Sequence, residues 1–252
     1  MTEAAHPPHS PLAQFEVKKL FTLPELFGYD ISFTNASLFM LLAVVGVTLF
    51  FGLGMRRAAL VPGRFQCMVE MTYNFIADML TETAGPEAMK YFPIIFSLFI
   101  FILFCNLFGM IPYSFTVTSH IIVTFAFAAF AFIGVTCIGF YKHGLHFLHF
   151  FVPSGLPGGI GGILLGAFMV VVEFFSYLAR PFSLSIRLAA NMMAGHTLLK
   201  IMAGFVGVGL VGIFPFAFLL IFTGFEIFVA CLQAYIFALL CSVYLNDALH
   251  MH

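Results

Sequence analysis

The longest charge-free stretch of the chain covers residues 91–141 and reads YFPIIFSLFIFILFCNLFGMIPYSFTVTSHIIVTFAFAAFAFIGVTCIGFY. Its 51 residues lie between Lys90 and Lys142 and contain no Asp, Glu, Lys or Arg. A helix that spans a bilayer needs about 20 apolar residues, so this stretch is long enough for two spans. Turn-forming residues from Pro112 to Ser119 divide it. We therefore predict a hairpin of two membrane helices.

The composition excludes most other classes of protein. Of the 252 residues, 62% are hydrophobic and 8% are charged, whereas soluble domains contain about 25% charged residues. No soluble fold of this size can bury so much apolar surface. A net charge of −1 does not suit a nucleic-acid binder, and no Walker-type phosphate loop is present. The five cysteines lack disulfide or metal spacing and are interpreted as small apolar residues.

Three further apolar stretches lie outside this hairpin. Ala36–Met55 contains no ionisable residue and ends at Arg56 and Arg57. Residues 161–205 follow a loop that is rich in Pro and Gly, and residues 216–245 follow a separate glycine-rich patch. The last two stretches exceed one bilayer thickness, so their helices must tilt or kink. The sequence therefore predicts an all-α polytopic membrane protein with five membrane helices, the last two long, tilted and antiparallel.

Residues 64–84 differ from the five spans because apolar and acidic side chains alternate at helical spacing. This pattern is typical of an amphipathic helix that lies along the membrane interface. Residues 1–35 show no signal-peptide pattern and are interpreted as an outer tail. Residues 36–252 then form a single membrane domain that includes the 161–246 hairpin. Lys and Arg gather in the 56–90 loop, which predicts an external N-terminus and an internal C-terminus.

The ionisable residues inside the last two spans are the candidate functional residues. Glu173, Arg180 and Arg187 are seven residues apart and share a helix face, which Asn191 continues. A charge at the bilayer centre costs roughly 2.5–3.5 kcal/mol on insertion scales. Arg187 cannot deprotonate and has no acid one turn away, so it must face a partner, water or a cavity. Arg180 could instead extend to the interface.

An antiparallel hairpin places several polar residues of the last two spans at equal depth. With a turn near residue 210 or 211, inside a glycine-rich patch, the pairs are Arg187 with Gln233, His196 with Glu226, and Glu173 with Asp247. Burial and pairing can move the pKa values of histidine and glutamate into the physiological range, so both side chains can pass protons. Arginine cannot, but it stabilises a nearby carboxylate. The arrangement indicates a proton path interrupted by a fixed positive charge, although His196 lies about half a turn from the Arg187 face.

Three segments resemble subunit a of rotary ATP synthases. They are residues 180–196 (RPFSLSIRLAANMMAGH), 232–237 (LQAYIF) and 106–112 (NLFGMIP). The resemblance covers about residues 36–248. Many bacterial members carry an acid at the position of His196 and a histidine at that of Glu226. The exchanged pair found here is similar to that of mitochondrial and alphaproteobacterial members.

The resemblance implies a stator subunit that translocates protons, works beside a rotating ring of c subunits and has peripheral-stalk b subunits and lipid as further partners. It implies two offset half-channels, no cofactor or metal, and a bacterial inner membrane, with the mitochondrial inner membrane less favoured. Arg187 would be the barrier that faces the ring carboxylate. The implied proton path consists of Glu173, Asn191, His196, Glu226 and Gln233. The chain would not be an enzyme on its own.

Two other functions remain open at this stage. A self-contained proton-coupled transporter or channel would also carry ionisable residues at mid-membrane, although no internal repeat is visible. A scaffold function in a membrane redox complex would give Arg187 and Glu226 no role. His143, His146 and His149 have a spacing that a metal site could use, but no acid or cysteine accompanies them, and we do not favour such a site.

Overall fold

The computed structural model describes residues 15–21, 32–56, 59–111, 114–144, 160–206 and 212–250. Five helical segments in these ranges are long and apolar enough to cross a membrane. They are α1 (Asn35–Met55), the short helix η2 (Pro86–Tyr91) with α3 (Phe92–Gly109), α4 (Ile121–His143), α5 (Ile160–Phe205) and α6 (Ile213–Leu249). The predicted class, an all-α polytopic membrane protein with five spans, is confirmed.

A small strand pair holds the described part of the N-terminal segment against the start of α1. Strand β1 (Lys19–Phe21) pairs antiparallel with β2 (Phe33–Thr34). The Asn35 side chain accepts a hydrogen bond from the Lys18 backbone and donates one to the Glu16 carbonyl. Thr34 caps α1 by accepting from the Ser37 backbone at 3.4 Å. The placement of residues 1–35 outside the membrane stays a prediction.

Helix α2 (Arg64–Ala84) is the amphipathic helix that the sequence predicts. It ends at Gly85, whose φ of +77° suits glycine, and Pro86 follows. One face of α2 is buried on protein, mainly against α6, with further contacts to η2 and α1. The ring of Phe75 lies 5.2 Å from that of Tyr235. Its position at the membrane interface stays a prediction.

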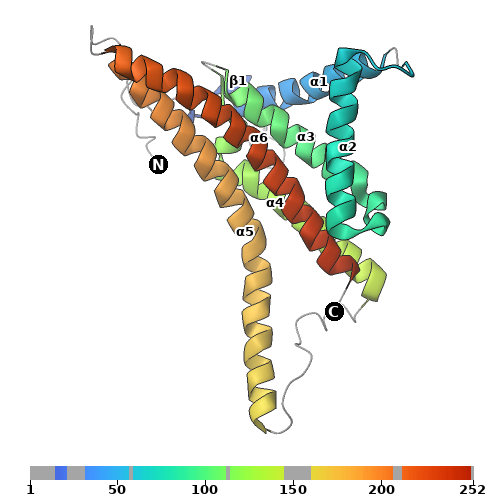
Figure 1. Ribbon diagram of the computed structural model, residues 1–252. Helices are drawn as coiled ribbons and strands as arrows, with labels where there is room; N and C mark the ends of the chain where they lie inside the picture. The colour runs from blue at the N-terminus through green and yellow to red at the C-terminus, as the bar shows by residue number, and fades with distance from the viewer. Residues whose placement is uncertain are drawn as a thin grey trace.

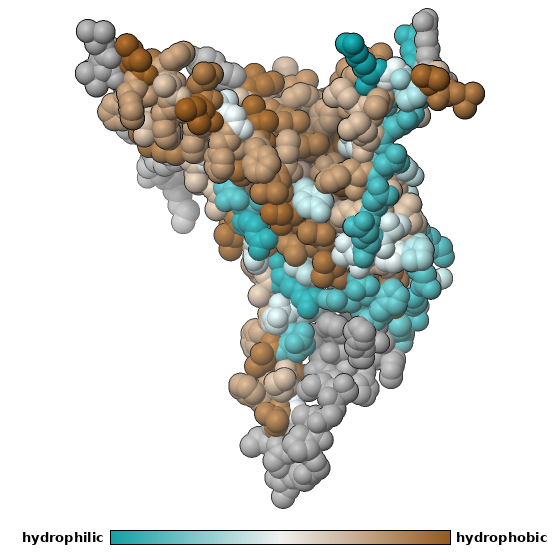
Figure 2. Space-filling model, viewed as in Figure 1, coloured by the Kyte–Doolittle hydropathy of each residue, from teal (hydrophilic) through white to brown (hydrophobic). Residues whose placement is uncertain are grey.

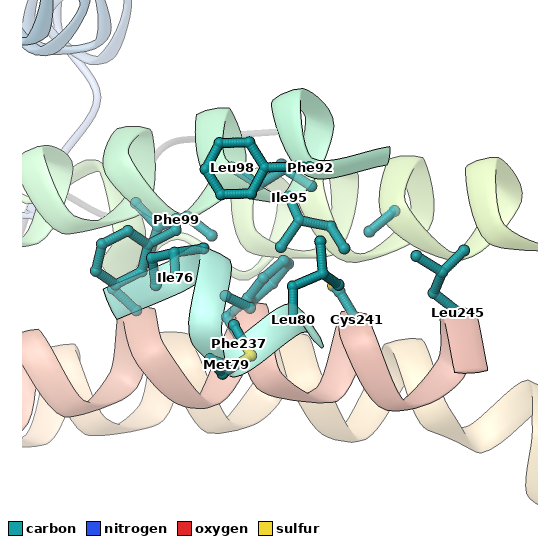
Figure 3. Packing of buried hydrophobic residues seen from close by; sticks show 14 of the residues in the cluster. Ile76, Met79, Leu80, Phe92, Ile95, Leu98, Phe99, Phe237, Cys241 and Leu245 are labelled. Carbon is teal, nitrogen blue, oxygen red and sulfur yellow. The ribbon is translucent and has the colours of Figure 1, made fainter. Parts of the chain in front are cut away.

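The core forms where α2, α3 and α6 meet, and α3 is the most enclosed of the five spans. Side chains of Ile76 and Leu80 from α2 point toward Phe99 of α3 and Phe237 of α6 (Figure 3). Small residues line the buried side of α6 at intervals of one turn, namely Ala230, Ala234 and Ala238. Their size lets α3 and α6 approach closely, as small residues do in other membrane bundles.

Helices α5 and α6 form the predicted long antiparallel hairpin (Figure 1). The 46 residues of α5 correspond to about 69 Å of helix, more than twice a hydrocarbon core of about 30 Å. Figure 1 shows that α5 bends part-way and that its first part leaves the bundle. Pro181 lies inside α5; it lacks an N–H group for the carbonyl one turn earlier, which explains a bend.

The described ranges leave out several predicted features. Pro112 of the first hairpin turn, the His-rich and Pro-rich loop at 145–159, and residues 207–211 of the last turn all lie outside them. Figure 2 shows apolar side chains over the turn end of the α5–α6 hairpin. Polar side chains gather along α2 and where α5 passes the C-terminal part of α6.

Candidate functional site

The six predicted site residues all lie on the α5–α6 hairpin. Helix α5 carries Glu173, Arg187, Asn191 and His196, whereas α6 carries Glu226 and Gln233. Because the two helices are antiparallel, the C-terminal half of α5 lies beside the N-terminal half of α6. The site therefore extends along the hairpin as separate groups at different depths.

His196 and Glu226 meet near the turn end of the hairpin. The Nδ1 atom of His196 lies 3.5 Å from Oε1 of Glu226, and their side chains are 11% and 5% exposed. This contact confirms the equal-depth pairing of the two residues. The backbone of Gly195 borders the carboxylate, since a Cβ atom at this position would lie 2.5 Å from Oε1.

Three polar atoms of this pair are buried and make no hydrogen bond within the described part of the chain. Neither carboxylate oxygen of Glu226 has a hydrogen bond with a described residue, nor does Nε2 of His196. A carboxylate can accept several hydrogen bonds, and an imidazole can donate through one nitrogen while it accepts through the other. The pair is therefore chemically able to exchange a proton between its members or with water.

Arg187 lies on the opposite, exposed side of α5, while Leu188 and Met192 of the same helix are buried. Within the described ranges its guanidinium has no hydrogen bond or ion pair. Asn191, one turn further along, is also exposed. The structure thus places the arginine that cannot lose its charge on an outer surface of the hairpin.

Gln233 is buried on α6, with 5% of its surface exposed. No hydrogen bond joins it to Arg187 in the described part of the chain. Asn106 of α3 lies at the same helix junction and donates to the carbonyl of Ala230 at 3.1 Å. Gln233 therefore faces the bundle, whereas Arg187 faces away from it.

Glu173 is connected to α6 through Arg180 at the other end of the site. The Arg180 guanidinium lies 3.0 Å from Oδ2 of Asp247 and 3.9 Å from Oε1 of Glu173. Its central carbon also lies 5.3 Å from the Tyr177 ring and 5.0 Å from the Tyr244 ring. Of the two alternatives for Arg180, the structure favours a paired charge over an extended one.

Comparison with known proteins agrees with this arrangement. The family model described as ATP synthase A chain matches residues 37–246. ATP synthase subunit a of Pelagibacter ubique (strain HTCC1062) is 54% identical over 245 residues, which cover 96% of this chain and 98% of that protein. The chain belongs to the ATP synthase subunit a family. The resemblance that the three sequence segments indicate is therefore confirmed.

In this member of the subunit a family, sequence reasoning missed the partners of Arg180. The sequence predicts only that Asp247 lies at the depth of Glu173, and it assigns no role to Tyr177 or Tyr244. The available signal was the seven-residue interval between Glu173 and Arg180, together with the equal depth of Asp247. Spacing alone could not show that one guanidinium contacts both carboxylates.

The histidines outside the hairpin take separate positions. Nε2 of His143 lies 3.3 Å from the Leu249 carbonyl, and Nδ1 of His250 lies 2.9 Å from Oδ1 of Asn246. His146 and His149 lie outside the described residues. In the described ranges, no group of three or more His, Cys, Asp and Glu side chains could hold a metal ion.

His120 lies between η3 (Val117–Ser119) and α4, at the turn of the first hairpin. Its ring stacks on Phe115 with 5.0 Å between centroids. Burial lowers the pKa of His120 below its ordinary value of 6.5, while a hydrogen bond with the Phe15 backbone opposes this shift. The neutral ring is therefore the favoured form in the folded chain.

Proposed function

We propose that this member of the subunit a family translocates protons through two offset half-channels beside a ring of c subunits. Proton flow there would be coupled to ATP synthesis or hydrolysis elsewhere in the complex. Family membership supports a role in the proton channel of an F-type ATP synthase. The exposed position of Arg187, between two groups of ionisable residues, is the observation that carries the finer proposal.

His196 with Glu226 and, at the other end of the site, Glu173 are chemically suited to opposite ends of a proton path. His196 and Glu226 can receive protons near the turn end and pass them toward the ring. Glu173 lies 14 residues from Arg187 in the other direction, or about 21 Å along the helix, and would take part in the exit. Asn191 and Gln233 can hold water or orient neighbours. Arg187 keeps its proton and would prevent protons from crossing directly.

The surroundings of Arg187 favour a partner protein over a self-contained transporter. A transporter that works alone encloses its mid-membrane charges among its own helices. Arg187 instead lies on the outside of α5, where an ionised carboxylate of a neighbouring ring could neutralise it. Peripheral-stalk b subunits and lipid would cover other faces of the bundle. The chain would bind no nucleotide itself.

The proposed setting is a bacterial inner membrane, with a periplasmic N-terminus and a cytoplasmic C-terminus. The distribution of Lys and Arg around the spans supports this orientation. The turn end of the hairpin, with His196 and Glu226, would then lie on the periplasmic side. Glu173 and Asp247 would lie toward the cytoplasm.

The test replaces Arg187 by alanine in the complete complex and measures ATP-driven acidification of inverted membrane vesicles. We expect pumping to be abolished while the complex still assembles. Lys200→Ala is the matched control, because Lys200 is an exposed cation of the same helix with no proposed role. Pumping by Arg187→Ala at the parental rate would overturn the proposal.

A further inference from the structure

An apolar groove lies between α1, α3 and α4, and none of its lining residues belongs to the α5–α6 hairpin. Its volume is about 650 Å³. Val44 of α1 and Phe130 of α4 line the groove and are both exposed, so the groove opens on the outer surface of the bundle. A molecule in the membrane could therefore enter it from the side.

The interior of the groove offers no polar group to a ligand. Two lining residues carry a hydroxyl, and both hydroxyls are bonded within their own helices. Thr48 Oγ1 donates to the Val44 carbonyl at 2.8 Å, and Ser97 Oγ donates to the Ile94 carbonyl at 2.9 Å. The other lining side chains are hydrocarbons. A polar ligand would leave its own polar groups unpaired there, so the groove suits a hydrocarbon chain.

The size of the groove favours an acyl chain over a helix of a partner protein. A helix is about 10–12 Å wide, so a segment that crosses a hydrocarbon core of about 30 Å occupies more than about 2,000 Å³. The groove has about a third of this volume and falls within the range of small-molecule sites. Its lining on α1, from Val44 to Phe51, covers about 10 Å of helix, which is less than the depth of one leaflet.

Two unpaired arginines lie at the corner where α1 ends and α2 begins. Arg56 follows α1, Arg64 is the first residue of α2, and both are exposed. Within the described ranges neither guanidinium has a hydrogen bond or an ion pair. The first acid of α2, Glu70, accepts a hydrogen bond from Gln66 at 2.6 Å. Figure 2 shows hydrophilic side chains at this corner, at the upper right of the view. Its excess of positive charge attracts anionic headgroups.

Aromatic packing connects this corner to the groove. The ring of Phe50 lies 5.3 Å from that of Phe65, near the start of α2. The ring of Phe51 lies 5.5 Å from that of Phe96 on α3, and both of these residues line the groove. Along α1 the lining begins about 7.5 Å from Arg56 and ends about 18 Å from it. A chain attached to a headgroup beside Arg56 therefore reaches the groove within about one leaflet.

We propose that the groove binds an acyl chain of an anionic phospholipid whose phosphate contacts Arg56 and Arg64. Guanidinium groups donate hydrogen bonds to phosphate in a geometry that fits both partners. The chain would fill the space between α1 and the α3–α4 pair and would thereby stabilise the position of α1. This role is separate from proton translocation, and it holds on whichever side of the membrane α1 ends.

The test uses the complete complex in phosphatidylcholine vesicles that contain phosphatidylglycerol. Equal trace amounts of one lipid or the other carry a photoactivatable diazirine in the acyl chain. After illumination, digestion and mass spectrometry identify the labelled residues. We expect the groove residues of α1, α3 and α4 to be labelled more strongly by phosphatidylglycerol than by phosphatidylcholine. Equal labelling of the groove by the two lipids would overturn the proposal.

Substitution of the arginines tests the headgroup contact. Arg56→Gln and Arg64→Gln should each lower labelling of the groove by phosphatidylglycerol roughly fivefold, the effect of one cation beside an anionic lipid. Labelling by phosphatidylcholine should not change. Lys200→Gln is the matched control, because it removes an exposed cation from α5, and it should leave both lipids unaffected. Parental labelling in both arginine variants would show that the corner does not hold the headgroup.

A second pair of substitutions tests the chain contact. Ser97→Phe places a ring in the groove and should reduce its labelling by both lipids. Ile133→Phe places a ring on an exposed position of α4 that does not line the groove, and labelling there should remain parental. Equal labelling of the groove in these two variants would contradict the assigned position of the chain.

A partner helix in the groove would give a different result. Neither lipid would then label the groove, whereas exposed apolar residues at the turn end of the hairpin, such as Phe214 and Leu220, would still be labelled. This pattern would overturn the proposal and assign the groove to another subunit. Labelling is normalised to assembled complex, so that a variant that assembles poorly does not imitate a loss of lipid.

Discussion

The Glu226 carboxylate occupies the space beside the Gly195 backbone where other residues would carry a side chain. A Cβ atom at residue 195 would lie 2.5 Å from Oε1 and 2.9 Å from Cδ of Glu226. The Glu226 side chain is only 5% exposed, so it has little room to move aside. The contact between α5 and α6 at this depth therefore depends on the absence of a side chain at residue 195.

Gly195→Ala should reduce proton translocation by roughly tenfold or more, because displacement of a proton-transfer group by about 1 Å has effects of this size. ATP-driven acidification of inverted vesicles measures the loss. Gly204→Ala is the matched control, since a Cβ atom at residue 204 meets nothing within 4 Å on the same helix. Equal pumping by Gly195→Ala and Gly204→Ala would contradict the prediction.

Exchange of the acid and the imidazole should preserve more function than removal of either. His196→Ala and Glu226→Ala should each lower proton pumping at least tenfold, because each leaves one buried polar group without its partner. The double variant His196→Glu with Glu226→His retains both groups at the same depth. It should pump faster than either single variant, with an altered pH profile. Pumping rates of the three variants, normalised to assembled complex, provide the test.

Ala128 and Ala126 provide a matched test of the packing of α4. Ala128 is 1% exposed, whereas Ala126 is exposed. Ala128→Leu should destabilise the bundle by about 1–3 kcal/mol, as overpacking of a buried position does, and should lower the melting temperature of the purified complex. Ala126→Leu should leave the melting temperature nearly unchanged. A similar effect of both substitutions would mean that Ala128 is not enclosed.

The stability of the chain should depend on pH through His120. Because burial lowers the pKa of His120 below 6.5, the folded chain favours the neutral ring and the unfolded chain takes up a proton more readily. This contribution to stability is fully present above pH 6.5 and decreases as the pH falls through the lower pKa of the folded chain. His120→Gln should remove this part of the pH dependence.

Thermal unfolding of the purified complex between pH 7.5 and pH 5 tests this prediction. As the pH falls, the melting temperature of the parental complex should decrease more than that of His120→Gln. A constant difference over this range would show that His120 does not titrate with unfolding. His250→Gln serves as a control, since His250 lies at the exposed end of α6.

The sequence alone was sufficient for the number of spans, the amphipathic helix at 64–84 and the long last hairpin. These features follow from local properties, namely the length of uncharged runs and the spacing of apolar residues. Equal depth of His196 and Glu226 was also predictable, because an antiparallel hairpin with a known turn relates residue numbers to depth. The family resemblance depended on short segments that can be read without a structure.

Only the tertiary structure decided which polar residues touch and which side of the hairpin each one faces. Arg187 and Gln233 are predicted to lie at one depth, yet one is exposed and the other is buried in the bundle. Arg180 contacts Asp247 because the rotation of α6 about its axis points Asp247 toward α5. Residue spacing gives the depth and the face of a residue within its own helix. The rotation of one helix against another depends on the packing of all five spans, such as the small residues between α3 and α6, and spacing does not contain that information.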